Sequence, residues 1–183
     1  MRGPLASVLG LINLTSCATT SSTRPPTFGP PSNGRIKNLD YTIKQILDHS
    51  KNSRVPVYPD VVFLRSLIDD ILWQLEYLKN FKKTETRIEI PASMRIISDK
   101  YRLTVILQNL MANAFKYHDV SKEQHRIVVQ VKQDNESIAI TVEDNGIGMN
   151  DEVKQRACDM FFRGTNESDG AGLGLYIARE SAA

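Results

Sequence analysis

Six consecutive residues, Asp144-Asn145-Gly146-Ile147-Gly148-Met149, join a carboxylate to two glycines at the end of an alternating apolar run. Glycine lets the backbone adopt positive φ and approach a ligand closely, while the carboxylate offers a fixed acceptor. The segment could therefore place Asp144 at the mouth of a pocket whose floor is bare backbone. An Asn-Gly hairpin turn is the alternative, because such turns use the same residues.

Two asparagines upstream, Asn109 and Asn113, are four residues apart in a predicted helix, so both project from one face. Lys116 and Tyr117 follow one turn later. An amide oxygen is a neutral ligand for Mg²⁺, lysine offers positive charge to a phosphate, and tyrosine offers an aromatic face to a base. The alternative is a solvated polar face that ends in a core tyrosine.

A second glycine segment, Gly170-Ala171-Gly172-Leu173-Gly174-Leu175, opens another predicted helix. Backbone N–H groups at a helix N-terminus bind anions, helped by the helix dipole. Together the three segments predict a nucleotide site, with adenine at Asp144, phosphates at Lys116 and the second glycine segment, and Mg²⁺ at Asn113. A flexible loop before a helix is the alternative, and the segment is neither a P-loop nor a dinucleotide fingerprint.

The elements that must hold these segments follow from the spacing of apolar residues. A broad stripe predicts a helix packed on a flat surface, formed by Leu64, Leu67, Ile68, Ile71, Leu72, Leu75 and Leu78. Asp99 is a suitable N-cap for the asparagine helix, whose expected inward residues are Leu103, Ile106, Leu107, Leu110 and Ala114. Further strands are predicted at 87–90, 95–98, 127–132 and 138–143, and helices at 99–117, 150–158 and 173–180. This order predicts an α+β fold with helices on one face of a sheet.

Residues 1–55 predict a separate helical hairpin. Leu5, Val8, Leu9 and Ile12 have helical spacing, residues 17–34 have the Pro, Ser and Thr content of a loop, and a narrow apolar seam follows at Ile36, Leu39, Ile43 and Ile46. One hairpin cannot bury two seams by itself. We therefore expect a homodimer in which two hairpins form a four-helix bundle.

The overall composition points to no particular partner. The formal net charge is +2 and no Lys/Arg block suggests a nucleic-acid interface. Cys17 and Cys158 lack metal-ligand spacing and are expected to be free thiols in a reducing compartment. No apolar run is long enough to span a bilayer. These features favour a cytoplasmic protein, without a transmembrane segment in this chain.

With these segments in this order, the chain resembles the catalytic part of a sensor histidine kinase of two-component systems. Four boxes carry the resemblance: Asn109–Tyr117, Asp144–Met149, Met160-Phe161-Phe162-Arg163 and Gly170–Leu175. They imply a Bergerat-type ATP-binding fold, a two-layer α/β sandwich, over residues 57–183, with residues 150–172 as the ATP lid. The family continues beyond the last helix with two more strands, so a fold without its last strands and of marginal stability is expected.

The resemblance also implies roles for single residues. Asp144 would bind the adenine amino group, Tyr117 would pack on the base, Asn113 would hold Mg²⁺, and Lys116 and Arg163 would meet phosphate. The other expected nucleotide-binding residues are Asn109, Gly146, Ile147, Gly148, Met149, Phe162, Thr165, Gly170, Gly172, Leu173, Gly174 and Leu175.

One position of the asparagine helix separates two activities within the resemblance. ATP-hydrolysing relatives carry a water-activating glutamate at the position of Asn109, and an asparagine cannot act as that base. This difference favours phosphoryl transfer to a protein over ATP hydrolysis. Asn109, Lys116 and Arg163 are the expected catalytic residues.

The N-terminus resembles the end of a phosphoacceptor box in Met1-Arg2-Gly3-Pro4-Leu5, with the acceptor histidine two residues before this chain begins. An export signal ending at a lipid-modified Cys17 is the alternative. His49 lacks the acceptor context.

The resemblance implies transfer of the ATP γ-phosphoryl to a histidine and then to an aspartate of a response-regulator receiver domain, in a full-length sensor that can be associated with a membrane. A degenerate module that binds ATP or dimerises without turnover is the second hypothesis. An exported lipoprotein is the third.

Overall fold

The computed structural model describes residues 56–134, 137–165 and 171–182, which all belong to Ile36–Ala183, the second of the two units into which the chain divides. The predicted hairpin of residues 1–55 and Gly170 lie outside the described residues. The elements are β1 (Pro59–Phe63), α3 (Leu64–Leu75), the 3-10 helix η1 (Phe81–Lys83), β2 (Thr84–Glu89), β3 (Arg95–Asp99), α4 (Lys100–Lys116), β4 (His125–Gln133), β5 (Ile138–Asp144), α5 (Asp151–Arg156) and α6 (Gly174–Ala182).

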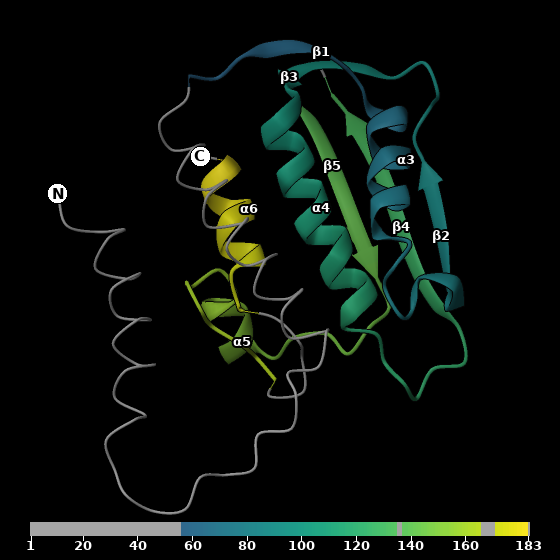
Figure 1. Cartoon of the computed structure of the whole chain (residues 1–183), viewed down its shortest axis with the longest axis vertical. Helices are drawn as coiled ribbons and strands as arrows, with labels where there is room; N and C mark the ends of the chain where they lie inside the picture. The colour runs from purple at the N-terminus through teal and green to yellow at the C-terminus, as the bar shows by residue number, and fades with distance from the viewer. Residues whose placement is uncertain (1–55, 135–136, 166–170, 183) are drawn as a thin grey trace, which may run out of the picture. The chain divides into compact units, whose positions relative to one another are not determined.

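The strands form two sheets, and helices cover one face of the larger sheet (Figure 1). β2, β4 and β5 make a three-stranded sheet, with β2 parallel and β5 antiparallel to β4. β1 and β3 pair separately as an antiparallel two-stranded sheet. Figure 1 shows α3 and α4 side by side over the same face of the β2-β4-β5 sheet. The predicted α+β arrangement of helices on a sheet is therefore confirmed, although the strands do not form one continuous sheet.

β1 is the strand that the sequence pattern did not predict. Its five residues run directly into α3, so Phe63 acts as N-cap without a side-chain hydrogen bond. The Leu64 N–H instead donates to the Met94 carbonyl oxygen, at 3.2 Å. The predicted helical stripe begins at Leu64, and strand and helix follow each other without a polar break that would indicate a separate strand before it.

α3 has the buried stripe that its leucines predict. Leu64, Leu67, Ile68, Ile71 and Leu75 are at most 3% exposed. They pack against Ile127 and Val129 of β4 and against α4, in one hydrophobic core. Burying each such side chain contributes about 1.5–3 kcal/mol to folding. Leu72 and Leu78 are only partly buried at the edge of this core.

α4 begins at the predicted cap and turns its apolar residues towards the core. The Asp99 carboxylate accepts a hydrogen bond from the Arg102 N–H at 3.0 Å. This hydrogen bond is the largest cause that holds the pKa of Asp99 below its ordinary value. Leu107 and Ala114 are buried as expected, but Met111 and Phe115 are the more central residues, at 0% and 1% exposed. The remaining expected residues, Leu103, Ile106 and Leu110, are half-buried.

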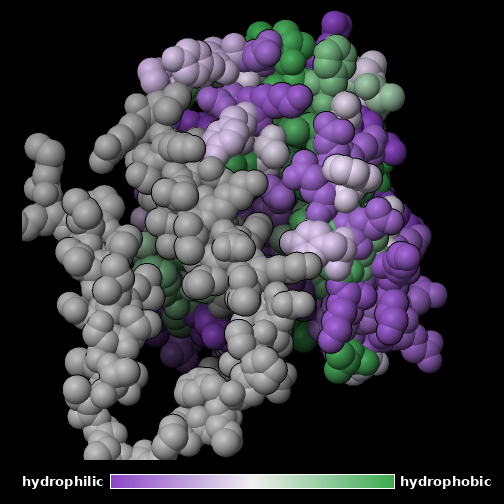
Figure 2. Space-filling model, viewed as in Figure 1, coloured by the Kyte–Doolittle hydropathy of each residue, from purple (hydrophilic) through white to green (hydrophobic). Residues whose placement is uncertain are grey.

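The surface is unevenly apolar. In Figure 2 hydrophobic residues gather at the top of the view, near β1, while much of the right-hand side is hydrophilic. Val61 and Ile97 lie opposite each other across β1 and β3, and with Phe63 they are each more than half exposed. None of the helices in the described ranges is both long and apolar enough to cross a membrane.

Candidate functional site

The segment Asp144–Met149, called here the Asp144 turn, leaves the end of β5 and leads to α5. The next element along the described chain is this helix and not a partner strand for β5, so the hairpin-turn alternative is wrong. The Gly146 N–H donates to Asp144 Oδ1 at 2.8 Å. The Ile147 N–H donates at 3.0 Å to the carbonyl oxygen of Tyr117, the C-cap residue of α4. The turn is thus bonded to the C-terminal end of the asparagine helix.

Close contact with Tyr117 explains why residue 146 is glycine. A Cβ atom at this position would lie 2.2 Å from the Tyr117 carbonyl oxygen and 2.8 Å from Asp144 Oδ1. Gly148 has a different reason, because its φ is +69° and a Cβ there would meet nothing within 4 Å. One glycine therefore provides space and the other provides a left-handed backbone conformation.

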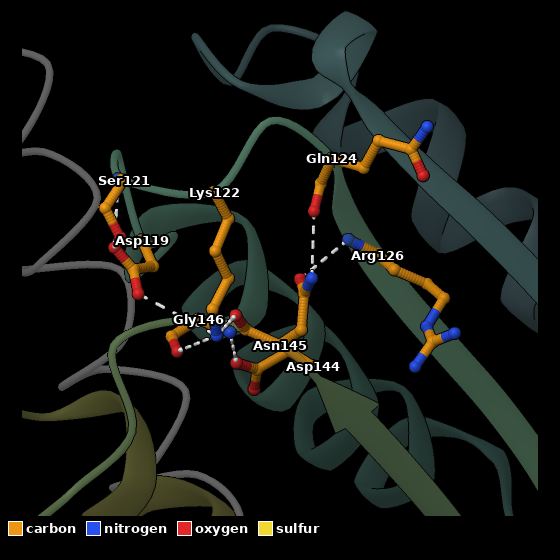
Figure 3. Close-up of polar contacts among 8 residues, drawn as sticks. All are labelled: Asp119, Ser121, Lys122, Gln124, Arg126, Asp144, Asn145 and Gly146. Atoms are coloured by element: carbon orange, nitrogen blue, oxygen red, sulfur yellow. Dashed lines mark hydrogen bonds and ion pairs between the residues drawn. The ribbon is translucent and has the colours of Figure 1, made fainter.

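Asn145 fastens the other side of the turn to the start of β4. Its Oδ1 accepts from the Arg126 N–H at 2.8 Å, and its Nδ2 donates to the Gln124 carbonyl oxygen at 2.8 Å (Figure 3). Lys122 Nζ donates to the carbonyl oxygen of Asn145 at 2.6 Å. The sequence did not indicate Asn145 or Lys122 as site residues, and an Asn-Gly pair signalled only the turn.

The two asparagines of α4 face the start of α6. Asn109 is 6% exposed, and its Nδ2 donates to the Val105 carbonyl oxygen at 2.8 Å. A Cβ atom at Gly174 would lie 3.0 Å from Asn109 Oδ1 and 3.8 Å from the half-buried Asn113 Nδ2. The first residue of α6 is therefore packed on the asparagine face of α4, and Figure 1 shows α6 alongside α4.

The phenylalanine box contacts the second glycine segment. Gly172 has φ +70°, and a Cβ there would lie 2.5 Å from the Phe162 carbonyl oxygen. Phe161 itself has a φ of 65°, a strained value for a residue with a side chain. The Arg156 guanidinium of α5 lies 4.4 Å from the centre of the Phe162 ring. These contacts join α5, the phenylalanine box and the residues before α6.

The remaining predicted residues lie along the same segments. Lys116 and Tyr117 are half-buried at the end of α4, and Arg163 is exposed next to the half-buried Thr165. Ile147 and Met149 are 52% and 44% exposed in the Asp144 turn. Leu173 is buried and Leu175 is half-buried at the start of α6.

The donor set fits magnesium held largely by a nucleotide. Within the described residues no group of three or more His, Cys, Asp or Glu side chains could hold a metal ion. An Mg²⁺ ion prefers six oxygen ligands and commonly takes one or two from protein and the rest from phosphate and water. The half-buried Asn113 side chain, whose Nδ2 would lie 3.8 Å from a Cβ atom at Gly174, carries an amide oxygen of the kind that suits such a site.

Comparisons with known proteins agree with this geometry. Residues 98–183 match the family model described as histidine kinase-, DNA gyrase B-, and HSP90-like ATPase. The sensor-like histidine kinase SenX3 of Mycobacterium tuberculosis is 33% identical over 103 residues, covering 54% of this chain and 24% of SenX3. The sensor histidine kinase YvrG of Bacillus subtilis is 41% identical over 152 residues, covering 78% of this chain and 24% of YvrG.

The fold agrees as well. The histidine kinase ThkA superposes with a TM-score of 0.60 at 20% identity, covering 98% of this chain and 50% of the ThkA chain. The chain spans about a quarter of the length of these two relatives, 24% for both SenX3 and YvrG. Residues 98–183 therefore belong to the histidine kinase-, DNA gyrase B- and HSP90-like ATPase family, and the chain carries a sensor histidine kinase ATPase domain.

Proposed function

We propose that the chain binds Mg·ATP and is the catalytic core of a sensor histidine kinase, which transfers the γ-phosphoryl group to a histidine. One observation carries the proposal. The Asp144 turn is bonded to the C-terminal end of α4, and Gly174 is packed on the asparagine face of the same helix. Two glycine segments that are distant in sequence thus meet one helix, which carries the amide and lysine side chains.

Asp144 gives the proposed site its preference for adenine. Its Oδ1 is held by the Gly146 N–H, which fixes the carboxylate as an acceptor. The exocyclic amino group of adenine is a donor, so it complements this acceptor, whereas guanine and hypoxanthine present a carbonyl oxygen. The half-buried Tyr117 offers an aromatic face for the base at the end of α4.

The phosphates would lie towards the start of α6. Backbone N–H groups at the N-terminus of this nine-residue helix favour anions. Lys116 and Arg163 would add positive charge, and Asn113 would supply an amide oxygen to Mg²⁺. An ion held there would neutralise negative charge on the phosphate oxygens.

Asn109 supports transfer to a protein rather than to water. Its side chain is 6% exposed, and an amide cannot remove a proton from water. Phosphoryl transfer depends mainly on positioning and charge neutralisation, which this site provides without a base. A histidine nitrogen would then attack the γ-phosphorus, and ADP would leave with the bridging oxygen.

We propose that the phosphoryl group passes first to a histidine on a dimerisation hairpin and then to an aspartate of a response regulator. ThkA was solved in complex with the response regulator protein TrrA, which supports a receiver domain as partner. Homodimerisation through residues 1–55 belongs to the same proposal. Sedimentation equilibrium of chain 1–183 and of 56–183 tests it, because only the longer chain should dimerise.

The test of kinase activity uses chain 1–183, Mg·[γ-³²P]ATP and a partner protein with an intact acceptor histidine. We expect acid-labile label on the partner, and a loss of at least tenfold in the Asn113→Asp and Asp144→Asn variants. Lys132→Met, which removes an exposed charge on β4, is the matched control. If the chain binds ATP tightly but leaves the partner unlabelled, the kinase proposal is rejected and the degenerate nucleotide-binding module is favoured.

A further inference from the structure

The loop between α4 and β4 carries a lysine that holds the backbone of the Asp144 turn (Figure 3). Lys122 Nζ donates to the carbonyl oxygen of Asn145 at 2.6 Å and to that of Gly146 at 3.4 Å. Lys122 lies outside all four sequence boxes. Its partners are 23 and 24 residues away in the sequence, so only the fold reveals the contact.

The two carbonyls that Lys122 holds belong to the two peptide planes that define the turn. A peptide group is planar, so the direction of its C=O fixes the direction of its N–H. The Asn145 carbonyl shares its plane with the Gly146 N–H, which donates to Asp144 Oδ1 at 2.8 Å. The Gly146 carbonyl shares its plane with the Ile147 N–H, which donates to the Tyr117 carbonyl oxygen at 3.0 Å.

Lys122 is itself held in place by an anchored carboxylate. Asp119 Oδ2 lies 3.7 Å from Lys122 Nζ. Asp119 Oδ1 accepts from the Ser121 hydroxyl at 2.7 Å and from the Ser121 N–H at 3.0 Å. These hydrogen bonds from Ser121 are the main reason that the pKa of Asp119 lies below its ordinary value, with a smaller contribution from Lys122. Asp119 therefore stays charged throughout the neutral range and keeps the lysine near the turn.

We propose that Lys122 is a positioning residue for adenine recognition. It fixes the peptide plane whose N–H orients the Asp144 carboxylate, and its positive charge polarises that peptide and strengthens the N–H donor. This inference rests on the proposed function, because it assigns the adenine amino group to Asp144. It adds that selectivity for the base depends on a residue of the α4–β4 loop that does not touch the nucleotide.

The experiment compares the affinities of the full chain for Mg·ADP and Mg·IDP, by calorimetry, in wild type, Lys122→Met, Lys122→Arg and Lys132→Met. Inosine carries a carbonyl where adenine carries the amino group, so the ADP/IDP ratio reports the Asp144 acceptor. We expect Lys122→Met to weaken ADP binding about three- to tenfold, the size of one partly exposed charged hydrogen bond, and to lower the ratio by the same factor. Lys122→Arg restores the ratio to within twofold, and Lys132→Met leaves it unchanged.

A double-mutant cycle with Asp144→Asn separates positioning from a general loss of charge. If Lys122 acts through Asp144, Lys122→Met changes ADP affinity less than twofold in the Asp144→Asn background. An unchanged ADP/IDP ratio in Lys122→Met, or an equal effect in both backgrounds, overturns the inference. Should Lys122→Met not fold, Lys122→Gln, which removes the charge but keeps an N–H donor group, takes its place in the same comparison.

The two proposals fail in different ways. A wild-type chain that binds neither nucleotide overturns the proposed function and this inference together. A wild-type chain that prefers ADP, loses that preference in Asp144→Asn and keeps it in Lys122→Met retains the proposed function and overturns only the role of Lys122.

Discussion

Replacing Gly146 by alanine tests the tight contact between the Asp144 turn and α4. The new Cβ would lie 2.2 Å from the Tyr117 carbonyl oxygen. Carbon–oxygen contacts are ordinarily about 3.3 Å or longer, so the turn must move away by about 1 Å. The Ile147 N–H to Tyr117 bond, now 3.0 Å, would then stretch beyond hydrogen-bonding distance. The Gly146 N–H to Asp144 bond would be disturbed by the same movement.

The loss follows from these two hydrogen bonds. Each contributes about 1 kcal/mol net, so Gly146→Ala should lower the free energy of unfolding by about 2 kcal/mol. For a chain of this size the melting temperature should fall by roughly 4–8 °C. The misplaced carboxylate should also weaken Mg·ADP binding by at least tenfold, as measured by calorimetry at a temperature where the variant stays folded.

Gly148→Ala is the matched control, because the same substitution two residues away meets no atom within 4 Å. It introduces only the strain of a left-handed residue, about 1–2 kcal/mol. Gly148→Asn should recover part of that cost, since asparagine tolerates this conformation better, whereas Gly146→Asn should recover nothing. If Gly146→Ala binds ADP within twofold of wild type, or if asparagine rescues both positions, the steric argument is wrong.

Three further predictions concern the core, the cap and the lid. Phe115→Ala should lower the unfolding free energy by about 3–5 kcal/mol in chemical denaturation, because the ring is 1% exposed; a loss below 1 kcal/mol would show that the ring is not central. Asp99→Ala should cost about 1 kcal/mol at pH 7 through loss of the α4 cap. Since the pKa of Asp99 is lowered by its hydrogen bond from Arg102, this carboxylate stabilises the fold above about pH 4, and the advantage of wild type over Asp99→Asn should shrink as the pH falls through the lowered pKa. Gly172→Ala should destabilise the chain more than Gly148→Ala, because it adds a contact of 2.5 Å with the Phe162 carbonyl oxygen to the same backbone strain; equal melting temperatures would contradict this.

Local spacing predicted the parts of the site that depend on local geometry. Asn109 and Asn113 share a helix face because they are four residues apart, and Asp99 caps that helix because its side chain reaches the Arg102 N–H. The strands β4 and β5 were also predicted close to their observed positions, because apolar residues alternate along each of them. In each case one short stretch of sequence contains all the interacting groups.

The features that could not be predicted from the sequence are contacts between segments that lie far apart along the chain. The parallel pairing of β2 with β4 and the separation of β1–β3 into its own sheet depend on how the strands meet after folding. Likewise, no residue near Lys122 in the sequence indicates that its ammonium group reaches the carbonyl oxygen of Asn145, 23 residues later. The positive φ of Phe161 is similar, because it is an uncommon conformation for this residue type, and only the fold brings the Phe161 backbone close to Gly172.

The use of a single helix to meet both glycine segments limits how the chain can vary. Each residue of an α-helix advances about 1.5 Å and turns about 100°. An insertion between Asn113 and Tyr117 would therefore rotate the asparagine face away from Gly174 while the Asp144 turn stayed bonded at the end of α4. An insertion in the connection between β4 and β5 would leave both contacts in place. We expect functional variants to keep the length of α4 unchanged, because this helix sets the spacing between its contacts with the two glycine segments. The length of the β4–β5 connection can vary freely.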